Sequence, residues 1–192
     1  MKNLKNIKRT NLSKDWATLD KIDYEYQFKN GEWKSISREC YNRGDGAAIF
    51  LYNVEKGTVI LTKQFRMPIY ENTKSEGMSI EVCAGSIEHS DKPLATILRE
   101  TEEEVGYKIS EAKEVFKTYT SPGALTEKLF LYVAEYTDAL KISDGGGLES
   151  ENEEIEVLEL PFSKVISMIE TEEIIDAKTI MLVQYAQINK LL

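Results

Sequence analysis

The chain has 192 residues, and its 33 acidic residues outnumber its 24 Lys and Arg, which gives a net charge of −9 and a pI near 4.9. This charge argues against electrostatic binding to nucleic acid or to anionic membranes, so neither is an expected partner. No apolar run approaches the ~20 residues needed to cross a bilayer, and no signal peptide is recognised. Cys40 and Cys83 make no metal-ligand spacing, so we expect free thiols in a reducing cytoplasm.

The first 44 residues predict an N-terminal arm. Its opening is polar, and two strand-like stretches follow, 16–28 and 32–43, joined by a hairpin signal that ends at Gly31. An isolated hairpin is only marginally stable, so this one needs another surface to cover. Trp16 could stack on a nucleotide base, but we favour a place in the core for it.

The next part of the chain predicts the centre of a sheet. Residues 47–53 and 58–66 are two buried-strand patterns separated by a short turn at Gly57. Residues 67–78 are polar and irregular, and we expect a loop that shapes the site. The stretch 78–85 then returns to a strand pattern.

A helix is strongly indicated between Gly85 and Tyr107. Pro93 suits the first turn of a helix, where its missing N–H loses nothing, and Gly106 suits the left-handed residue that ends one. Five residues between them recur at helical spacing and should face the core. They are Leu94, Ile97, Leu98, Thr101 and Val105. We give no role to His89, the only histidine.

Three carboxylates occupy the other face of this helix. Glu100, Glu103 and Glu104 are spaced i, i+3 and i+4, which places them on one side. Like charges at this spacing destabilise a helix by roughly 0.2–0.5 kcal/mol per pair, and a divalent cation would reverse that effect. Hard cations such as Mg²⁺ bind one or two carboxylates together with substrate phosphates. The alternative is a solvated acidic face, steadied by Arg99 paired with Glu102 or Glu103.

The rest of the sequence predicts three strands and two helices. Residues 114–136 indicate two strands bridged by a Ser-Pro-Gly turn, and 155–160 indicate a third. Three glycines at 145–147 favour mobility. The acidic cluster after them suits a loop that closes on substrate, or one that is simply solvated. Residues 162–174 and 177–192 carry apolar helical stripes and should cover the sheet.

The string from Gly85 to Tyr107 resembles the Nudix box, Gly-x5-Glu-x7-Arg-Glu-U-x-Glu-Glu-x-Gly-U, in which U is aliphatic. Both glycines, the arginine and the three glutamates following it are in register. Asp91 stands where the box has its first Glu, which usually supports the loop rather than binding metal. Thr101 replaces an aliphatic residue, and Tyr107 is a bulky substitute for the last one. The resemblance extends over nearly the whole chain, and it is strongest from 38 to 189.

The resemblance implies a fold and a metal site. The fold would be an α/β/α sandwich, in which a mixed sheet lies between helices, with an N-terminal antiparallel hairpin arm. The implied ligands of Mg²⁺, or of Mn²⁺ in its place, are the Ala84 backbone carbonyl and the carboxylates of Glu100, Glu104 and Glu153. Glu103 would complete the metal cluster, and Arg99 would orient the carboxylates. Glu151 would be the general base, and Glu149 and Glu154 are its rivals.

The chain is most similar to the branch that hydrolyses ADP-ribose and GDP-mannose. In that branch the arm packs across a dimer and contributes to the partner's substrate site, so the resemblance implies a homodimer. The implied substrate-binding residues are Arg38, Glu39, Arg43, Arg66, Ser86, Glu127 and Lys178. Arginine suits this role because its planar fork binds phosphate bidentately or stacks on a base. For Arg66 and Lys178, an ordinary surface charge is the alternative.

The resemblance therefore implies Mg²⁺-dependent hydrolysis of the diphosphate in a nucleoside diphosphate sugar. We rank GDP-mannose first, giving GMP and mannose 1-phosphate, because the final third resembles the GDP-mannose hydrolases. ADP-ribose is second. The arm argues against a nucleoside triphosphatase of the family, and the retained glutamates argue against a catalytically silent regulatory module. The predicted domains are the arm, 1–44, and the Nudix domain, 45–192.

Overall fold

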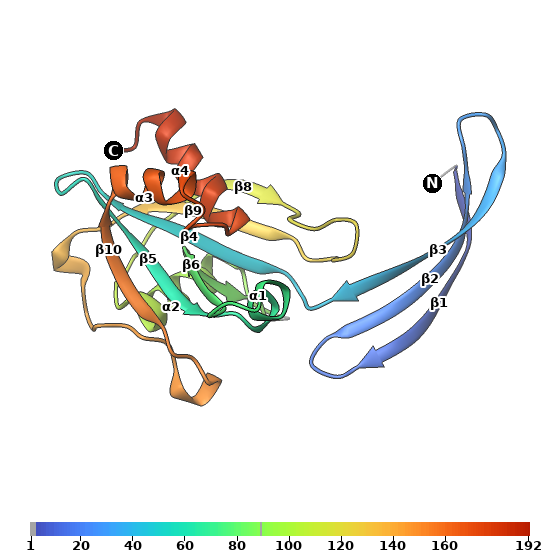
Figure 1. Ribbon diagram of the computed structural model, residues 1–192, viewed down its shortest axis with the longest axis horizontal. Helices are drawn as coiled ribbons and strands as arrows, with labels where there is room; N and C mark the ends of the chain where they lie inside the picture. Colours follow the sequence, from blue (N-terminus) through green and yellow to red (C-terminus); the bar gives the residue numbers. More distant parts are fainter. Residues whose placement is uncertain (1–2, 89) are drawn as a thin grey trace. The chain divides into compact units, whose positions relative to one another are not determined.

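The computed structural model describes residues 3–88 and 90–192, so His89 lies outside the described residues. The described residues form two compact units (Figure 1). Unit 1 comprises Met1–Asp45 and Tyr119–Lys128, and unit 2 comprises Gly46–Thr118 and Leu129–Leu192. Unit 1 therefore combines the arm with a segment that follows the Nudix box in the sequence.

Within the described residues, unit 1 is built on a three-stranded antiparallel sheet in the order β1-β2-β3. The strands are β1 (Leu4–Lys14), β2 (Thr18–Gln27) and β3 (Trp33–Asn42). The predicted hairpin is formed by β2 and β3, and Gly31 in its turn has a positive φ of 88°. The sequence did not predict β1. Almost all of its residues are exposed, so it lacks the apolar alternation of a half-buried strand.

The second segment of unit 1 carries the predicted Ser-Pro-Gly turn and is bonded to the end of β3. Tyr41 N–H donates to the Ala124 carbonyl (2.9 Å), and Thr126 N–H donates to the Tyr41 carbonyl (3.0 Å). Trp16, for which we favoured a core position, is 74% exposed, so that prediction is wrong. The residue lies in the connection between β1 and β2, and connecting segments run over protein surfaces.

Unit 2 contains a mixed sheet, as predicted. Its strands pair in the order β10-β5-β4-β9-β8, with β6 beside β5 and β7 beside β4. The β4–β9 pair is parallel and the remaining pairs are antiparallel. The strands are β4 (Gly46–Asn53), β5 (Thr58–Phe65), β6 (Met78–Glu81), β7 (Cys83–Ser86), β8 (Lys113–Thr118), β9 (Leu129–Glu135) and β10 (Glu156–Pro161).

The helices of unit 2 are α1 (Met67–Thr73), α2 (Pro93–Val105), α3 (Phe162–Glu170) and α4 (Ala177–Asn189), with 3₁₀ turns η1 (Asp138–Leu140) and η2 (Glu149–Glu151). Helix α1 lies where we expected a loop. It buries no side chain, so no apolar stripe announces it in the sequence. Among the described residues, no helix combines the length and apolar character that a membrane crossing requires.

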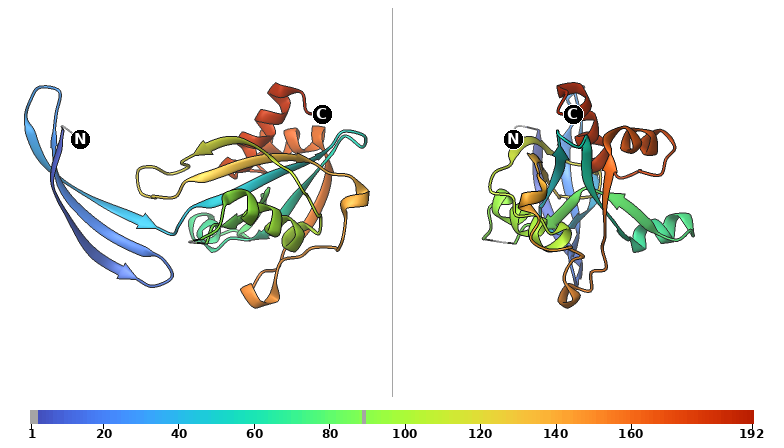
Figure 2. Two further views of the ribbon diagram at one scale, coloured as in Figure 1. Left: turned by 180° about the vertical axis from the view of Figure 1, so that it is seen from behind. Right: turned by 90° about the vertical axis from the view of Figure 1, so that its left-hand side faces the viewer.

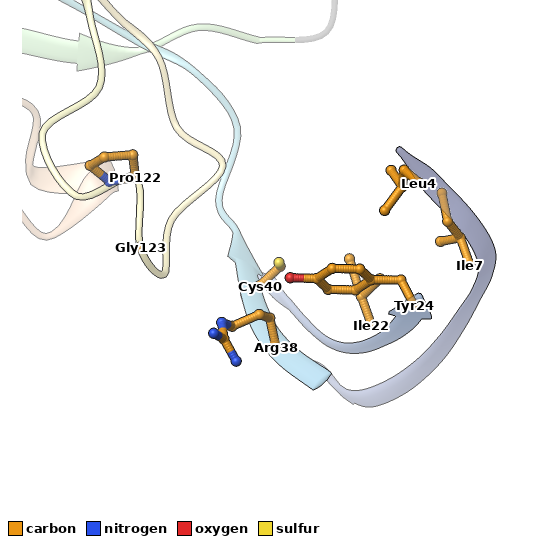
Figure 3. A pocket seen from close by; sticks show the side chains of 8 residues that line it. All are labelled: Leu4, Ile7, Ile22, Tyr24, Arg38, Cys40, Pro122 and Gly123. Carbon is orange, nitrogen blue, oxygen red and sulfur yellow. The ribbon is translucent and has the colours of Figure 1, made fainter. Parts of the chain in front are cut away.

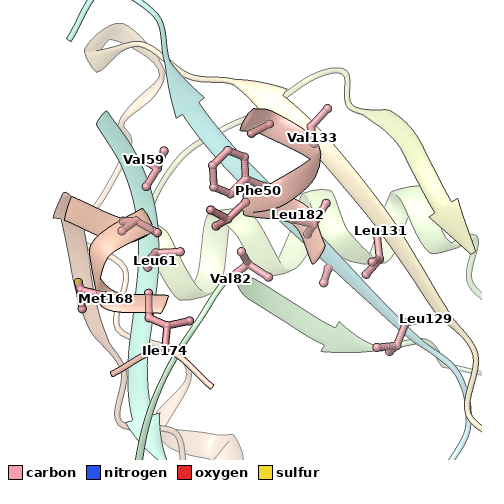
Figure 4. Packing of buried hydrophobic residues seen from close by; sticks show 14 residues of the cluster. Phe50, Val59, Leu61, Val82, Leu129, Leu131, Val133, Met168, Ile174 and Leu182 are labelled. Atoms are coloured by element: carbon pink, nitrogen blue, oxygen red, sulfur yellow. The ribbon is translucent and has the colours of Figure 1, made fainter. Parts of the chain in front are cut away.

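Both faces of the unit 2 sheet are covered. Along β4, Ala48 and Phe50 join a cluster that includes buried residues of α3 and α4, as Figure 4 shows. Ile49 and Leu51 join a second cluster with Ile97 of α2 on the opposite face. Figure 2 shows α2 on one side of the sheet and α3 and α4 on the other. The predicted α/β/α sandwich is confirmed, and it places the box helix on one face alone.

Candidate active site

Helix α2 carries most of the candidate site and forms as its end signals predict. It begins at Pro93 and ends at Val105, and Gly106 follows in the left-handed conformation with φ 76°. Most of the predicted core stripe is buried. Leu94 is exposed, so this part of the prediction is wrong. Burial along α2 begins only at Thr96, so the first turn does not contact the core.

Two of the three aligned carboxylates are buried. Glu100 is 8% exposed and Glu104 is 2% exposed, so the alternative of a solvated acidic face is wrong for these two residues. Buried charges in proteins are normally paired or coordinate a metal. The burial of the pair is therefore compensated by a positive partner, a metal ion or a proton.

Arg99 supplies part of that compensation. Its Nη2 donates to Glu100 Oε1 at 2.7 Å, and its Nη1 donates to Glu103 Oε2. One planar guanidinium thus holds two carboxylates of the same helix in fixed orientations. The ion pairs that the structure shows for Arg99 are with Glu100 and Glu103, and they do not include Glu104.

Glu104 is held by neutral donors instead. The backbone N–H of Ala84 donates to Glu104 Oε2 at 3.1 Å. Burial raises the pKa of Glu104 to about 7; hydrogen bonds from Cys83 and Ala84 oppose this shift, and the charges of Glu100 and Glu153 add to it. Burial disfavours the charged form of this carboxylate, and a bound cation would favour it.

The backbone of β7 approaches Glu100 closely. A Cβ atom on Gly85 would lie 2.3 Å from both Cδ and Oε1 of Glu100, a distance that no real contact allows. Glycine is therefore required here for close approach. Strand β7 and helix α2 together bring the main chain at Ala84 and Gly85 against the two buried carboxylates.

Gly85→Ala tests this packing. The added methyl group should displace the Glu100 carboxylate, weaken binding of a divalent cation and lower kcat/KM by about 10–100-fold, as for other losses of support around a metal. Mn²⁺ titration and steady-state kinetics measure the two effects. Gly123→Ala is the matched control, because its Cβ would meet open space. Equal kinetics for the two variants would contradict the account.

The three consecutive glycines also have a structural role. Gly146 N–H donates to the Glu104 carbonyl (2.9 Å), and Gly147 N–H donates to the Glu103 carbonyl (3.2 Å). All three glycines have positive φ, and a Cβ on Gly145 would lie 2.4 Å from the Glu104 carbonyl oxygen. They therefore cap the end of α2 at close range and connect the acidic loop to the box helix.

The glutamates of the acidic loop, residues 149–154, lie in different surroundings. Glu151 ends η2, and its side chain lies outside the described parts of the chain. Glu153 Oε2 accepts a hydrogen bond from Leu148 N–H at 3.1 Å, and its charge raises the pKa of Glu104, so the two acids are near each other. Glu149 and Glu154 are exposed.

The donor set fits a hard divalent cation by its chemistry. Carboxylate and carbonyl oxygens are the ligands that Mg²⁺ prefers. Among the described residues, no three acidic, His or Cys side chains already converge on one point. Glu100 is engaged by Arg99 and Glu153 by a backbone N–H. Glu100, Glu104 and Glu153 with the Ala84 carbonyl are the groups that would hold the ion.

Three predicted substrate residues belong to unit 2. Arg66 follows β5 at the start of α1, and Lys178 lies in the first turn of α4; both bind the carboxylate of Glu81. Lys178 is 12% exposed at its side chain, so the alternative of an ordinary surface lysine is wrong. Ser86 is an exposed residue at the end of β7. Glu81 is a single acid in an apolar strand pattern, and no motif in the sequence marks it.

The other four belong to unit 1. Arg38 and Glu39 are neighbours on β3, so their side chains point to opposite faces of the sheet. Arg43 Nε pairs with the buried carboxylate of Glu127 at 2.9 Å, and its guanidinium carbon lies 5.8 Å from the ring centroid of Trp16. The predicted Arg43 and Glu127 are thus direct partners.

Unit 1 also contains a cavity of about 470 Å³, shown in Figure 3. Its lining is mostly apolar, and Arg38 supplies the charged group. The lining residues are Leu4, Ile7, Ile22, Tyr24, Arg38, Cys40, Pro122 and Gly123. None of these residues belongs to the carboxylate cluster of α2.

Two family models match the chain, one after the other along the sequence. The model of the NUDIX domain matches residues 42–183, and the model described as the GDP-mannose pyrophosphatase NudK N-terminal domain matches residues 3–41. A Cronobacter sakazakii protein named GDP-mannose pyrophosphatase is 44% identical over 187 residues, which cover 97% of this chain and 96% of the relative. Proteins of the same name from Escherichia coli and Salmonella typhimurium are 44% and 45% identical over 186 residues, with the same coverage. The chain therefore belongs to the Nudix family of hydrolases, in the branch that contains the GDP-mannose pyrophosphatases.

Proposed function

We propose that this Nudix pyrophosphatase hydrolyses GDP-mannose to GMP and mannose 1-phosphate. The observation that carries the proposal is the pair of buried carboxylates on α2, Glu100 and Glu104, packed against the backbone of β7. Such a pair suits a divalent cation that binds together with a diphosphate. The choice of sugar nucleotide rests on relatives of that name, which are similar over 97% of the chain.

We further propose a role for each group of the site. Glu100, Glu104, Glu153 and the Ala84 carbonyl would hold Mg²⁺, or Mn²⁺ in its place, which when bound would offset the charge of the diphosphate and lower the pKa of water. Glu103 completes the acidic cluster, and Arg99 orients it through its two ion pairs. Glu151 accepts the proton of the attacking water as general base. Arg66 and Lys178 hold phosphate oxygens, and Ser86, at the end of β7, contacts the substrate.

The oligomeric state is a separate proposal. We propose a homodimer in which Arg38, Glu39, Arg43 and Glu127 of unit 1 contribute to the substrate site of the partner. Two observations support this role: Arg38 and Glu39 are exposed on β3, and Arg43, just beyond the strand, is held by the buried carboxylate of Glu127. The cytoplasmic location stays a prediction from the sequence.

Product release from GDP-mannose and ADP-ribose, measured side by side with and without Mg²⁺, tests the proposed function. We expect Mg²⁺-dependent hydrolysis with a higher kcat/KM for GDP-mannose. A preference for ADP-ribose would retain the mechanism and overturn the choice of substrate. Absence of Mg²⁺-dependent turnover on both would favour the alternative of a silent nucleotide-binding module.

Removal of residues 1–44 tests the shared site. We expect the truncated chain to be monomeric and to have a KM raised by at least about tenfold, because losing buried or bidentate charged contacts costs more than the roughly 1.4 kcal/mol that a tenfold change represents. Light scattering and steady-state kinetics measure both. The control is Arg43→Lys in the full-length chain, which keeps the strands and the charge but loses the guanidinium fork. A truncated monomer with full activity would contradict the proposal.

A further inference from the structure

Strand β6 ends in a buried acid that the proposed mechanism does not use. Glu81 is 4% exposed and is paired in register with Thr62 of β5 inside the sheet. Burying a carboxylate is costly unless it is paired and hydrogen-bonded. The contacts of Glu81 therefore indicate what it holds.

Both carboxylate oxygens of Glu81 bind cations. Arg66 donates through Nε to Oε1 (2.8 Å) and through Nη2 to Oε2 (2.9 Å), a bidentate pair. Lys178 Nζ donates to Oε2 at 2.6 Å. Burial alone would raise the pKa of Glu81, but the hydrogen bonds and charges of Arg66 and Lys178 outweigh it and lower the pKa to about 2. Glu81 is therefore ionised at neutral pH and holds both cations.

The lysine is supported from a second side. Asp176 Oδ1 accepts a hydrogen bond from Lys178 Nζ at 3.0 Å, and its Oδ2 caps α4 by accepting from Thr179 N–H at 2.9 Å. Thr179 Oγ1 in turn accepts from Val82 N–H at 2.8 Å. Val82 follows Glu81 and connects β6, which pairs with β5, to β7, which pairs with β4. The first turn of α4 is thus fixed directly beside Glu81.

The network does not use all the donor groups of Arg66. Among the described residues, the structure shows no partner for Nη1 of Arg66, whose side chain is 40% exposed. The charge of Glu104 acts on Arg66, so this guanidinium lies near that carboxylate. Arg66, which lies near the proposed metal ligand Glu104, and Lys178 are therefore held together by one inaccessible carboxylate.

We propose that Glu81 is a positioning residue for the diphosphate, because its buried carboxylate fixes Arg66 and Lys178 as one preformed anion-binding pair. This inference rests on the proposed function and specifies which protein group orients the substrate. Side chains that are already fixed lose less entropy on binding a ligand than flexible ones do. The contribution of Arg66 and Lys178 to substrate affinity therefore depends on the carboxylate that fixes them. Without Glu81, the two cations would repel each other and their side chains would separate.

Glu81→Gln is the first test, with Glu159→Gln as control. The control makes the same chemical change at a hydrogen-bonded acid of β10 in the same sheet, away from Arg66. We expect Glu81→Gln to lower kcat/KM by about 100-fold, as for a misplaced substrate contact, with most of the change in KM. Glu159→Gln should leave KM unchanged. An unchanged kcat/KM in folded Glu81→Gln would overturn the proposal.

A double-mutant cycle separates positioning from general stability. If Glu81 acts through Arg66, Arg66→Met should cost much less in the Glu81→Gln background than in the wild-type protein. Purely additive effects on kcat/KM would overturn the proposal, because a residue that only stabilises the fold would not alter the effect of Arg66. Circular dichroism and thermal unfolding confirm that each variant is folded.

Calorimetric binding of inorganic pyrophosphate in the presence of Mg²⁺ gives a readout that is independent of turnover. We expect binding by the wild-type protein and a Kd raised by at least about tenfold in Glu81→Gln. If that variant does not fold, Glu81→Asp replaces it, because its shorter side chain keeps the charge but cannot retain both cations. Equal affinities, or no binding by the wild-type protein, would overturn the proposal. Wild-type inactivity on both sugar nucleotides would refute only the proposed function, since the pyrophosphate comparison would still decide the role of Glu81.

Discussion

Replacing Glu104 with glutamine is expected to lower kcat on the order of 10³-fold, comparable to the loss of a central electrostatic contact in other active sites. Glutamine keeps the shape of the side chain and its acceptor for Ala84 N–H, so the fold should remain. It removes the negative charge that a divalent cation requires. Steady-state kinetics at saturating GDP-mannose, and Mn²⁺ titration followed by thermal unfolding, measure the two losses.

Without metal, Glu104→Gln should not lower the stability of the protein, in contrast to its effect on kcat and on metal binding. Burial raises the pKa of Glu104 to about 7, so the folded state holds this proton more tightly than the unfolded state does. Wild-type stability is therefore lost as pH rises from the unfolded pKa through 7, and Glu104→Gln avoids that loss. At pH 8 without metal, the variant should unfold at a temperature no lower than the wild type does.

Glu102→Gln is the matched control for this prediction. Glu102 lies on the same helix and is half-buried, and the change removes the same charge from α2 without touching the buried pair. Its kcat and its metal affinity should remain close to those of the wild-type protein. Near-normal turnover of Glu104→Gln would show that the assignment of the metal site is wrong.

The sequence predicted the sheet and the box helix because their signals are local. Strand β4 is an apolar run that is buried on both faces, and α2 has Pro93 and Gly106 at its ends. Strand β1 and helix α1 could not be found in this way, because they bury almost nothing and so carry no apolar period. Trp16 shows the converse error, since a large apolar ring does not itself specify burial.

The sequence identified the candidate residues of the site but not their surroundings. Helical spacing places Glu100 and Glu104 on one face, yet it cannot show that this face is buried against β7. The glycines at 145–147 predict mobility in the sequence, and the structure shows in addition that residues with positive φ at these positions cap α2. Glu81 had no local signal at all, because its partners are 15 and 97 positions away in the sequence.

Glu151→Gln is the second prediction with a large expected effect. A general base contributes about 10²–10⁴-fold to the rate, so kcat should fall by that amount while metal affinity is retained. The loop that carries Glu151 is tied to the end of α2 by backbone hydrogen bonds from Gly146 and Gly147, so the substitution should leave the buried carboxylates in place. The pH dependence of kcat should also lose the ionisation that belongs to the base.

Two neighbouring variants decide whether Glu151 is correctly assigned. Glu153 carries charge near Glu104, and a glutamine there would still accept the bond from Leu148 N–H. Glu153→Gln should therefore weaken metal binding more than it slows chemistry at saturating metal. Glu154 is exposed, and Glu154→Gln should leave both quantities near wild type. If Glu154→Gln or Glu153→Gln lowers kcat more than Glu151→Gln at saturating metal, the base is assigned to the wrong glutamate, while the metal site on α2 is unaffected by that result.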